Sequence, residues 1–357
     1  MAKKVTTTPK RKKKKESKLL PGLAVLFVLL FVCFSYYAYQ IVYTANVDTK
    51  GEDTYVYIPT GADYTEALDS VEATGVIIDK LSLRFMAKLM DYDELVKPGR
   101  YKLENGWGNR QLIGVLRSGE QEPVKLTFTN IRLRSQLAER LAASIEPEPA
   151  EIDSLLNDPA YLKELGFDTA NIVSMFIPNT YEVYWTTTAD ELIQRMNTEY
   201  DKFWTAERLE KAEELNLTQQ EVSTLASIVQ AETIKNDEKP RVAGVYLNRL
   251  KKGMLLQADP TVVLSVGDFS IRRVLNAHLK HDSPYNTYKY KGLPPGPINV
   301  PNISSIDAVL NAENHDYIYF CAKEDFSGYH AFAETEAEHR ANARRFHQAL
   351  NKRNIMK

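Results

Sequence analysis

The sequence predicts an α+β protein with three parts: an N-terminal transmembrane helix, a small βααβ subdomain, and a larger mixed α+β domain with a cleft. Three observations lead to this prediction. The run from Leu19 to Tyr43 contains no charged residue. Short strand-like stretches alternate with amphipathic helical stretches through the rest of the chain. A loop rich in Pro, Gly and Tyr at 283–301 interrupts the second half, and loops this long in compact domains tend to be functional.

The charge of the chain is unevenly distributed. The formal net charge of 357 residues is −2, but residues 1–18 carry nine Lys or Arg against Glu16 alone. The remainder therefore has 45 − 9 = 36 basic and 47 − 1 = 46 acidic residues, a balance of −10. An acidic body argues against nucleic acid as its main partner. A nucleic-acid-binding tail is the alternative for residues 1–18, but their position before an apolar span favours a basic cytoplasmic tail.

The apolar run at 19–43 is long enough to cross a bilayer, which takes about 20 residues. Basic residues before it should stay in the cytoplasm, and Tyr36, Tyr37, Tyr39 and Tyr43 suit the far interface. A cleaved signal peptide is the alternative, but its apolar region is usually shorter and no A-x-A-like site follows. We expect a single-pass anchor in the plasma membrane with 44–357 outside.

The chain has two cysteines, Cys33 in the span and Cys321 in the body. They cannot meet within one folded domain, so the body must depend on a full hydrophobic core rather than a disulfide. Too few cysteines are present for a Cys-based zinc site, and no ligand cluster predicts a metal or an organic cofactor.

The segment at 54–119 is predicted to form a small subdomain after a polar tether at 44–53. Strand-like YVYIP is followed by helical stretches, and PGRYKL returns as a second strand. This βααβ order resembles a LysM-like module, a type that often binds glycan, and a plain spacer is the equal alternative. The predicted helices are Tyr64–Thr74, Lys80–Met90 and Asn109–Arg117.

The domain at 120–357 begins with strand VKLTF and ends with a hairpin of DYIYFCAK and YHAFAET. The aromatic residues of SMFIPNTYEVYWTT could form core or line a groove, and core is the commoner outcome. The other predicted helices are Leu133–Ser144, Ile152–Leu156, Ala189–Lys211, one capped by Ser304 or Ser305 that runs through Asn311, and 335–352.

The stretch from Thr218 to Thr261 is predicted to be the functional centre of the larger domain, which holds it in place. Thr218 and Glu221 form a capping box that starts a helix. Asn236-Asp237 and Pro240 should end it. Helical periodicity places its apolar residues on one side with Glu232 at their edge, and three polar residues on the other. The apolar residues are Val222, Leu225, Ala226 and Val229, and the polar ones are Ser223, Ser227 and Gln230.

Glu232 is the candidate catalytic residue. A carboxyl near a helix C-terminus and among apolar neighbours should hold its proton, because desolvation and the helix dipole both disfavour the anion. A glutamic acid that is protonated at neutral pH is what a general acid for glycosidic cleavage requires. The alternative is a structural ion pair with Arg241 or Arg249, the commoner fate of such a residue.

Two further features flank this residue in sequence. Pro240 and Gly253 should bound a second helix, and Asp259 should cap a third, short one. The loop from Ser283 to Pro301 combines stiff prolines, tyrosines and the amide of Asn286, which together could line a sugar-binding surface. A proline-stiffened surface loop is the alternative.

Three sequence blocks resemble the endolytic murein transglycosylases, the MltG or YceG-like family. They are LASIVQAET, VAGVYLNRLKKGMLLQADPTV and YNTYKYKGLPPGPI, in this order. The resemblance implies a membrane-anchored bacterial enzyme that cuts the glycan strands of peptidoglycan internally, without a cofactor, near the peptidoglycan synthases. It implies that Glu232, which precedes Thr233, is the catalytic acid. The positions that it implies as cleft lining are Gln257, Asp259, Thr261, Tyr285, Asn286 and Tyr288.

The sequence departs from the family pattern at a few positions. Gln230 stands where many relatives have a second Glu, and Asn179 stands where they often have Asp, so neither is expected to act as an acid. Pro301-Asn302 replaces a common Pro-Gly. Three other functions stay open at this point: a muramidase that uses Asp259 as second carboxylate, a non-catalytic glycan-binding scaffold, and a membrane-anchored peptidase, for which no nucleophile motif is recognisable.

Overall fold

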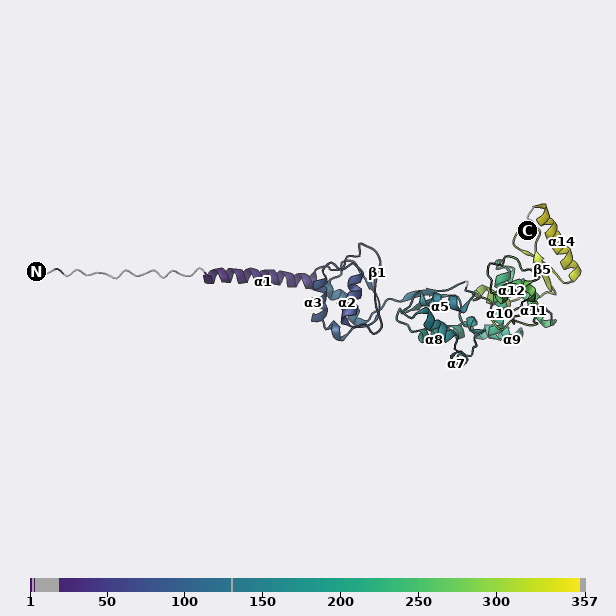
Figure 1. Ribbon diagram of the computed structural model, residues 1–357, viewed down its shortest axis with the longest axis horizontal. Coiled ribbons are helices and arrows are strands. Elements are labelled where there is room, and N and C mark those ends of the chain that lie inside the picture. Colours follow the sequence, from purple (N-terminus) through teal and green to yellow (C-terminus); the bar gives the residue numbers. More distant parts are fainter. Residues whose placement is uncertain (2, 4–18, 130, 354–357) are drawn as a thin grey trace. The chain divides into compact units, whose positions relative to one another are not determined.

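The computed structural model describes residues 1, 3, 19–129 and 131–353. The predicted basic tail at 1–18 therefore lies outside the described residues, apart from residues 1 and 3. The chain divides into two compact units, 1–122 and 123–357 (Figure 1). The boundary falls close to the predicted one at residue 119.

The first unit begins with the helix α1, Leu19–Tyr43. Its segment Pro21–Tyr43 is long and apolar enough to cross a membrane by length and composition. Most of its described side chains are exposed, but Ile41 near its end is buried in the core of the small subdomain. The predicted helix is thus confirmed, and its last turns join the fold that follows.

The segment at 44–53 is not the free tether that its polar composition suggests. Ala45 forms a β-bridge with Gly108, and Val47 forms one with Ile77. The Asn46 side chain is buried and donates a hydrogen bond of 2.6 Å to Asn109 Oδ1. Val47 and Thr49 are also buried, so the middle of this segment is part of the subdomain, whereas its charged side chains are exposed.

The small subdomain has the predicted βααβ order. Strands β1, Thr54–Ile58, and β2, Gly99–Leu103, pair antiparallel. Between them lie α2, Tyr64–Ala73, and α3, Lys80–Leu89, and the short 3-10 turn η1, Tyr92–Glu94, follows α3. Helix α4, Asn109–Ser118, completes the unit. The core is formed by apolar residues of both strands and all three helices, among them Ile58, Leu68, Leu83, Leu103 and Leu112.

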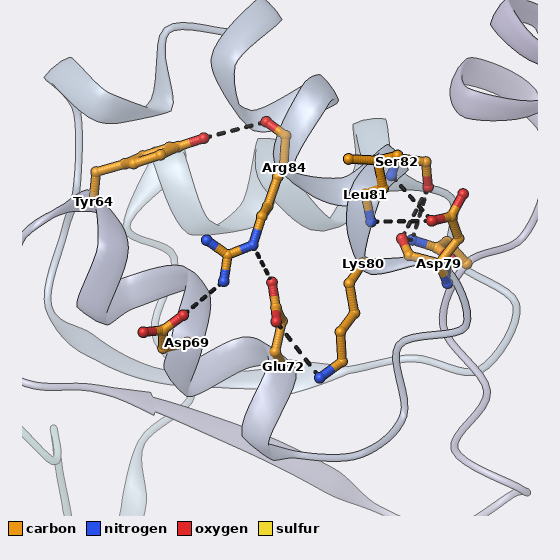
Figure 2. Close-up of polar contacts among 9 residues, drawn as sticks. Tyr64, Asp69, Glu72, Asp79, Lys80, Leu81, Ser82 and Arg84 are labelled. Carbon is orange, nitrogen blue, oxygen red and sulfur yellow. Dashed lines mark hydrogen bonds and ion pairs between the residues drawn. The ribbon is translucent and has the colours of Figure 1, made fainter.

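Polar contacts fix α3 against α2 (Figure 2). Arg84 Nε lies 2.6 Å from Glu72 Oε1, and Arg84 Nη2 lies 2.6 Å from Asp69 Oδ1. The Asp79 carboxylate caps α3 by accepting hydrogen bonds from the backbone N–H groups of Leu81 and Ser82. The orientation of α3 is therefore set by contacts at its start and along one side.

The second unit is mostly helical, with two antiparallel strand pairs, β3–β4 and β5–β6. Its elements before the central stretch are β3, Val124–Thr127; α5, Arg134–Ala142; α6, Pro149–Leu156; α7, Pro159–Glu164; η2, Ile172–Met175; β4, Thr180–Val183; α8, Ala189–Phe203; and α9, Ala206–Glu214. The others are α10, Gln219–Glu232; α11, Lys239–Lys251; α12, Asp259–Val266; η3, His278–Lys280; α13, Ile303–Leu310; β5, Tyr319–Ala322; β6, His330–Ala333; and α14, Glu336–Lys352.

Several predicted elements need correction. The single helix predicted at 189–211 is two helices, because Thr205 caps α9 by accepting a hydrogen bond from the Arg208 N–H. The aromatic stretch before α8 contains strand β4, and its side chains Phe176 and Tyr181 are buried in the core. Helix α13 has Asn302 as its N-cap, instead of the predicted Ser304 or Ser305. The predicted C-terminal hairpin and final helix are confirmed.

Helix α10 is the central helix of this unit. Its predicted capping box is present, with Thr218 Oγ1 accepting from the Glu221 N–H at 3.2 Å. It packs against α11, α12 and α13 (Figure 1). Ser223 and Ser227, predicted on an outward face, are fully buried. The two-sided prediction failed here because neighbouring helices and the 283–301 loop surround α10, and Ser227 accepts a hydrogen bond from the Ile298 N–H at 2.9 Å.

Candidate active site

Glu232 is the last residue of α10, with Thr233 at the C-cap. Its side chain is partly buried and lines a cleft of about 680 Å³. The cleft is also bordered by the start of α12, by the segment at 269–274, and by Gln230 and Asn299. The carboxyl therefore faces a space that could admit a ligand, and it does not point into bulk solvent.

The hydrogen-bond partner of Glu232 is Tyr246, which lies on α11. Its hydroxyl donates to Glu232 Oε1 at 2.9 Å. Tyr246 is 1% exposed, and burial together with the charge of Glu232 raises the pKa of this phenol well above its ordinary value. The hydroxyl therefore stays protonated at neutral pH and donates to the carboxylate.

Burial raises the pKa of Glu232 from 4.5 to about 7. The hydrogen bond from Tyr246 opposes this rise because it stabilises the anion. The negative charge of Asp259 adds to the rise, and the more distant Arg249 reduces it. A pKa near 7 means that the carboxyl exists in both protonation states at neutral pH, as an acid that later acts as a base requires.

Neither arginine considered as an ion-pair partner of Glu232 binds it. Arg241 pairs with Glu313 at 2.9 Å. Arg249 donates to the backbone carbonyls of Ile318 and Leu256, each at 2.6 Å. Since these guanidinium groups have other partners, the structural ion-pair interpretation of Glu232 is wrong.

Asp259 lies on the same cleft, and Tyr288 is its partner. The Tyr288 hydroxyl donates to Asp259 Oδ1 at 2.6 Å. Asp259 is exposed and is the first residue of α12, whereas the N-cap is Ala258. The predicted role of Asp259 as the cap is therefore wrong, and its carboxylate is left to face the cleft with Glu232.

Two predicted cleft residues, Thr261 and Asn286, are instead fully buried. Thr261 Oγ1 bonds Thr287 Oγ1 at 2.8 Å. The Asn286 amide donates to the carbonyl oxygen of His281 at 2.7 Å. Thr261 thus holds the 283–301 loop against α12, and Asn286 holds it to the segment at 279–281, so both shape the site without lining it.

The other two predicted residues lie at the margin of the site. Gln257 is exposed, with a left-handed backbone at φ 51° and its N–H bonded to the Thr287 carbonyl. Tyr285 lines a neighbouring hollow of about 270 Å³. The structure thus brings Glu232, Asp259 and Tyr288 together and places the other four predicted residues around them.

The second half of the 283–301 loop forms a wall of the site. Gly296 lies so close to the carbonyl of Ala170 that a Cβ would overlap it. Asn299 donates to the Ser227 carbonyl at 3.0 Å and accepts from the amide of Gln230 at 3.0 Å. The surface-loop alternative is wrong for this half, because residues 296–301 are buried, and Ile298 and Asn299 line the cleft.

Three hollows adjoin one another around the site. Glu232 is shared by the main cleft and by a hollow of about 360 Å³ next to the β5–β6 hairpin. At the other end, Arg132 and Leu264 are shared by the main cleft and the hollow that contains Tyr285. Shared wall residues make these hollows neighbouring parts of one surface, with Glu232 between two of them.

The sequence profile of the YceG-like family matches residues 56–345, most of the chain.

The chain belongs to the YceG-like family.

Relatives of this YceG-like chain include two proteins named endolytic murein transglycosylase. One is from Streptococcus pneumoniae serotype 2, at 27% identity over 89% of this chain and 63% of the relative. Another is from Bacillus subtilis, at 26% identity over 84% of this chain and 86% of the relative. The chain thus spans less than two thirds of the streptococcal relative's length. The resemblance found in the three sequence blocks is confirmed.

A crystal structure of a YceG-like protein from Listeria monocytogenes also resembles this YceG-like chain. The TM-score is 0.55 with 28% sequence identity, over 81% of this chain and 98% of the other.

Sequence reasoning missed several residues of the YceG-like site. Tyr246 lies within the second of the three sequence blocks. A phenol on an otherwise apolar face of α11 is the sequence feature that could have indicated it. The cations Arg132, Arg272 and Arg273 also line the main cleft. Arg132 lies over the ring of Phe269, 5.4 Å from its centroid. None of these three guanidinium groups pairs with a carboxylate among the described residues.

Within the described ranges, no group of three or more His, Cys, Asp or Glu side chains could hold a metal ion.

Proposed function

We propose that this chain is a membrane-anchored lytic transglycosylase of peptidoglycan. In this proposal it cleaves the β-1,4 bond between N-acetylmuramic acid and N-acetylglucosamine, with Glu232 as the single general acid and base. The observation that carries the proposal is a glutamic acid with a pKa near 7 that lines a cleft and has a phenol as its only hydrogen-bond partner among the described residues. The names of the relatives support the same reaction.

The reaction needs one proton to be given and then recovered. Glu232 protonates the oxygen that links the two sugars, and the bond from the anomeric carbon to that oxygen breaks through an oxocarbenium-like state. The Glu232 carboxylate then takes the proton of the C6 hydroxyl, whose oxygen bonds the anomeric carbon and closes a 1,6-anhydro ring. No water is consumed, and Glu232 ends protonated as it began. The acetamido group of the sugar can assist, as in substrate-assisted glycosidases.

Tyr246 has a positioning role in this scheme. Its hydroxyl fixes one carboxylate oxygen and stabilises the anion that forms after proton donation. General acid–base catalysis supplies roughly 10²- to 10⁴-fold, so orientation and electrostatics within the cleft must provide the rest.

The surface around Glu232 suits a polymer that is cut internally. Hollows extend from Glu232 both towards the β5–β6 hairpin and towards Arg132, so sugar units could lie on both sides of the cleaved bond. The guanidinium groups of Arg132, Arg272 and Arg273 line the cleft and pair with no carboxylate among the described residues. They suit the carboxylates that peptidoglycan carries on its muramyl units. We therefore assign Asp259, Tyr288, Gln257 and Tyr285 to substrate binding.

Helix α1 would place this chemistry at the outer face of the plasma membrane, with the basic tail in the cytoplasm. There the enzyme would meet nascent strands close to the peptidoglycan synthases. For the LysM-like subdomain we propose the spacer role of the two alternatives. The burial of Ile41 and Asn46 in it supports this, because they join the subdomain directly to the end of α1.

Mass spectrometry of the products from purified cell-wall sacculi tests the proposal. We expect the chain to release fragments with 1,6-anhydromuramic ends, and Glu232→Gln to release none. Glu210→Gln, at an exposed site on α9, is the matched control and should behave like the parent. Products heavier by one water would indicate a muramidase, and binding to sacculi without any products would indicate a scaffold. Either result would refute the proposal.

A further inference from the structure

Helix α3 of the small subdomain carries an apolar stripe on its exposed face. Leu81, Phe85 and Leu89 are 70%, 56% and 62% exposed. They are spaced by four residues, so they lie on one face of the helix. Ile78, just before the helix, is also exposed. The opposite face is buried in the core through Leu83, Met86 and Ala87, so α3 is apolar on both its covered and its uncovered side.

The start of this stripe is bonded to the residues that follow α1. The Ile78 N–H donates to the Asn46 carbonyl at 3.0 Å. The Asn46 side chain donates to the Asp79 carbonyl at 2.9 Å and accepts from the Asp79 N–H at 2.6 Å. Asn46 is only the third residue after Tyr43, where α1 ends. Helix α3 also packs against α1 directly, and Figure 1 shows the two adjoining.

This connection sets the depth of the stripe in a membrane. A bilayer is about 30 Å thick in its hydrocarbon core and about 40–45 Å with its headgroups, which leaves roughly 5–8 Å of interface on each side. Three residues of extended chain reach at most about 10 Å. If α1 spans the bilayer, the start of α3 must therefore lie at or just above the headgroup level.

Basic side chains border the stripe along one edge. Lys80, Arg84 and Lys88 follow one another at the same four-residue spacing. Each of them pairs with a carboxylate of the subdomain: Lys80 and Arg84 with Glu72, Arg84 also with Asp69, and Lys88 with Asp93. The attraction of this face to a bilayer therefore comes from the apolar residues of the stripe rather than from these charges.

We propose that the Ile78–Leu81–Phe85–Leu89 stripe inserts into the outer interface of the membrane that α1 spans, and so docks the small subdomain on the bilayer. Lipid is the occupant that the structure favours, because the stripe begins at residues bonded to Asn46, three residues after the end of α1, and α3 packs against α1. This inference depends on the proposed anchoring by α1 and is independent of the glycan chemistry.

Site-directed spin labelling of the full chain in vesicles of phosphatidylethanolamine and phosphatidylglycerol tests this proposal. In a Cys33→Ser, Cys321→Ser background, nitroxides are attached at Leu81→Cys, Phe85→Cys and Leu89→Cys. Val28→Cys in α1 is the lipid reference, and Glu210→Cys on α9 is the water reference. All these positions are exposed, so the labels should not disturb folding. Collision rates with oxygen and with a water-soluble nickel complex are then measured.

We expect the oxygen-to-nickel collision ratio at the three stripe positions to exceed that of the water reference several-fold and to stay below that of Val28→Cys, because Val28 lies within the span and the stripe lies in the interface. Stripe labels that collide freely with nickel, while Val28→Cys does not, would overturn the proposal and leave the anchoring intact. Stripe labels protected from both reagents would also overturn it, because they would indicate a protein partner. If Val28→Cys itself collides with nickel, the anchoring fails and this proposal fails with it.

Discussion

Replacing Tyr246 by Phe removes one hydroxyl and should move the pKa of Glu232 upward. In the structure this hydroxyl is the side-chain donor to Glu232, at 2.9 Å, and it lowers the pKa that burial raises. The ring of Tyr246 packs in the core and is retained by Phe, so the fold should persist.

The size of this effect follows from the hydrogen bond. A hydrogen bond to a charged group contributes about 1.5–3 kcal/mol, which corresponds to roughly 1–2 pKa units. Glu232 is partly exposed to the cleft, so water will replace part of the lost interaction, and we expect a rise of about one unit. The acid then stays protonated to higher pH, and the alkaline limb of the pH profile of kcat/KM should move from near pH 7 to near pH 8.

The assay is release of anhydro-ended fragments from sacculi between pH 5 and pH 9. Tyr181→Phe is the matched control, because its buried hydroxyl bonds the Ile177 carbonyl and has no contact with Glu232. It should leave the alkaline limb in place. An unchanged or acid-shifted limb in Tyr246→Phe would refute the assignment of this limb to Glu232.

Three further predictions concern the same site. Glu232→Gln should stabilise the protein at pH 8 by about 1–3 kcal/mol and change its stability little at pH 4. The reason is that folding raises the pKa of Glu232 from 4.5 to about 7, so the parent loses stability as pH rises through that window. Thermal melting at both pH values measures this, and an equal difference between the two proteins at pH 4 and pH 8 would contradict it. Asp259→Asn removes a negative charge that raises the pKa of Glu232, so the alkaline limb of the pH profile of kcat/KM should move down by less than about one unit. A loss of kcat/KM beyond roughly 10³-fold at all pH values would instead favour Asp259 as a second catalytic carboxylate. Gly296→Ala should destabilise the catalytic unit by about 1–3 kcal/mol in urea unfolding, because the added methyl group would overlap the carbonyl of Ala170. Gly114→Ala has open space around it and should not destabilise the protein. Equal stability of the two variants would contradict the close packing of the loop at residue 296.

Much of the fold could be predicted because its signals are local. The capping box at Thr218, the proline in the first turn of α11 and the C-terminal hairpin each depend on a few neighbouring residues, and each was confirmed. Glu232 was found for the same reason, since its place at the end of an apolar helix can be counted from the sequence.

The rest depends on contacts between distant segments. The burial of Ser227 and Asn286 follows from the 283–301 loop folding over α10 and α12, which periodicity within one helix cannot reveal. Tyr246 and Arg132 reach the site from other elements of the unit. Sequence reasoning therefore located the carboxyl group but missed the partner that tunes its pKa.

The most direct test of the central claim is a carboxyl carbon NMR titration of Glu232. Glutamate is labelled with carbon-13 in the detergent-solubilised chain, and the Glu232 signal is assigned by its absence from Glu232→Gln. We expect a midpoint near pH 7, as burial next to Tyr246 requires. A midpoint near 4.5, the ordinary value for a glutamate, would show that this carboxyl is ionised at neutral pH and would contradict its role as the acid.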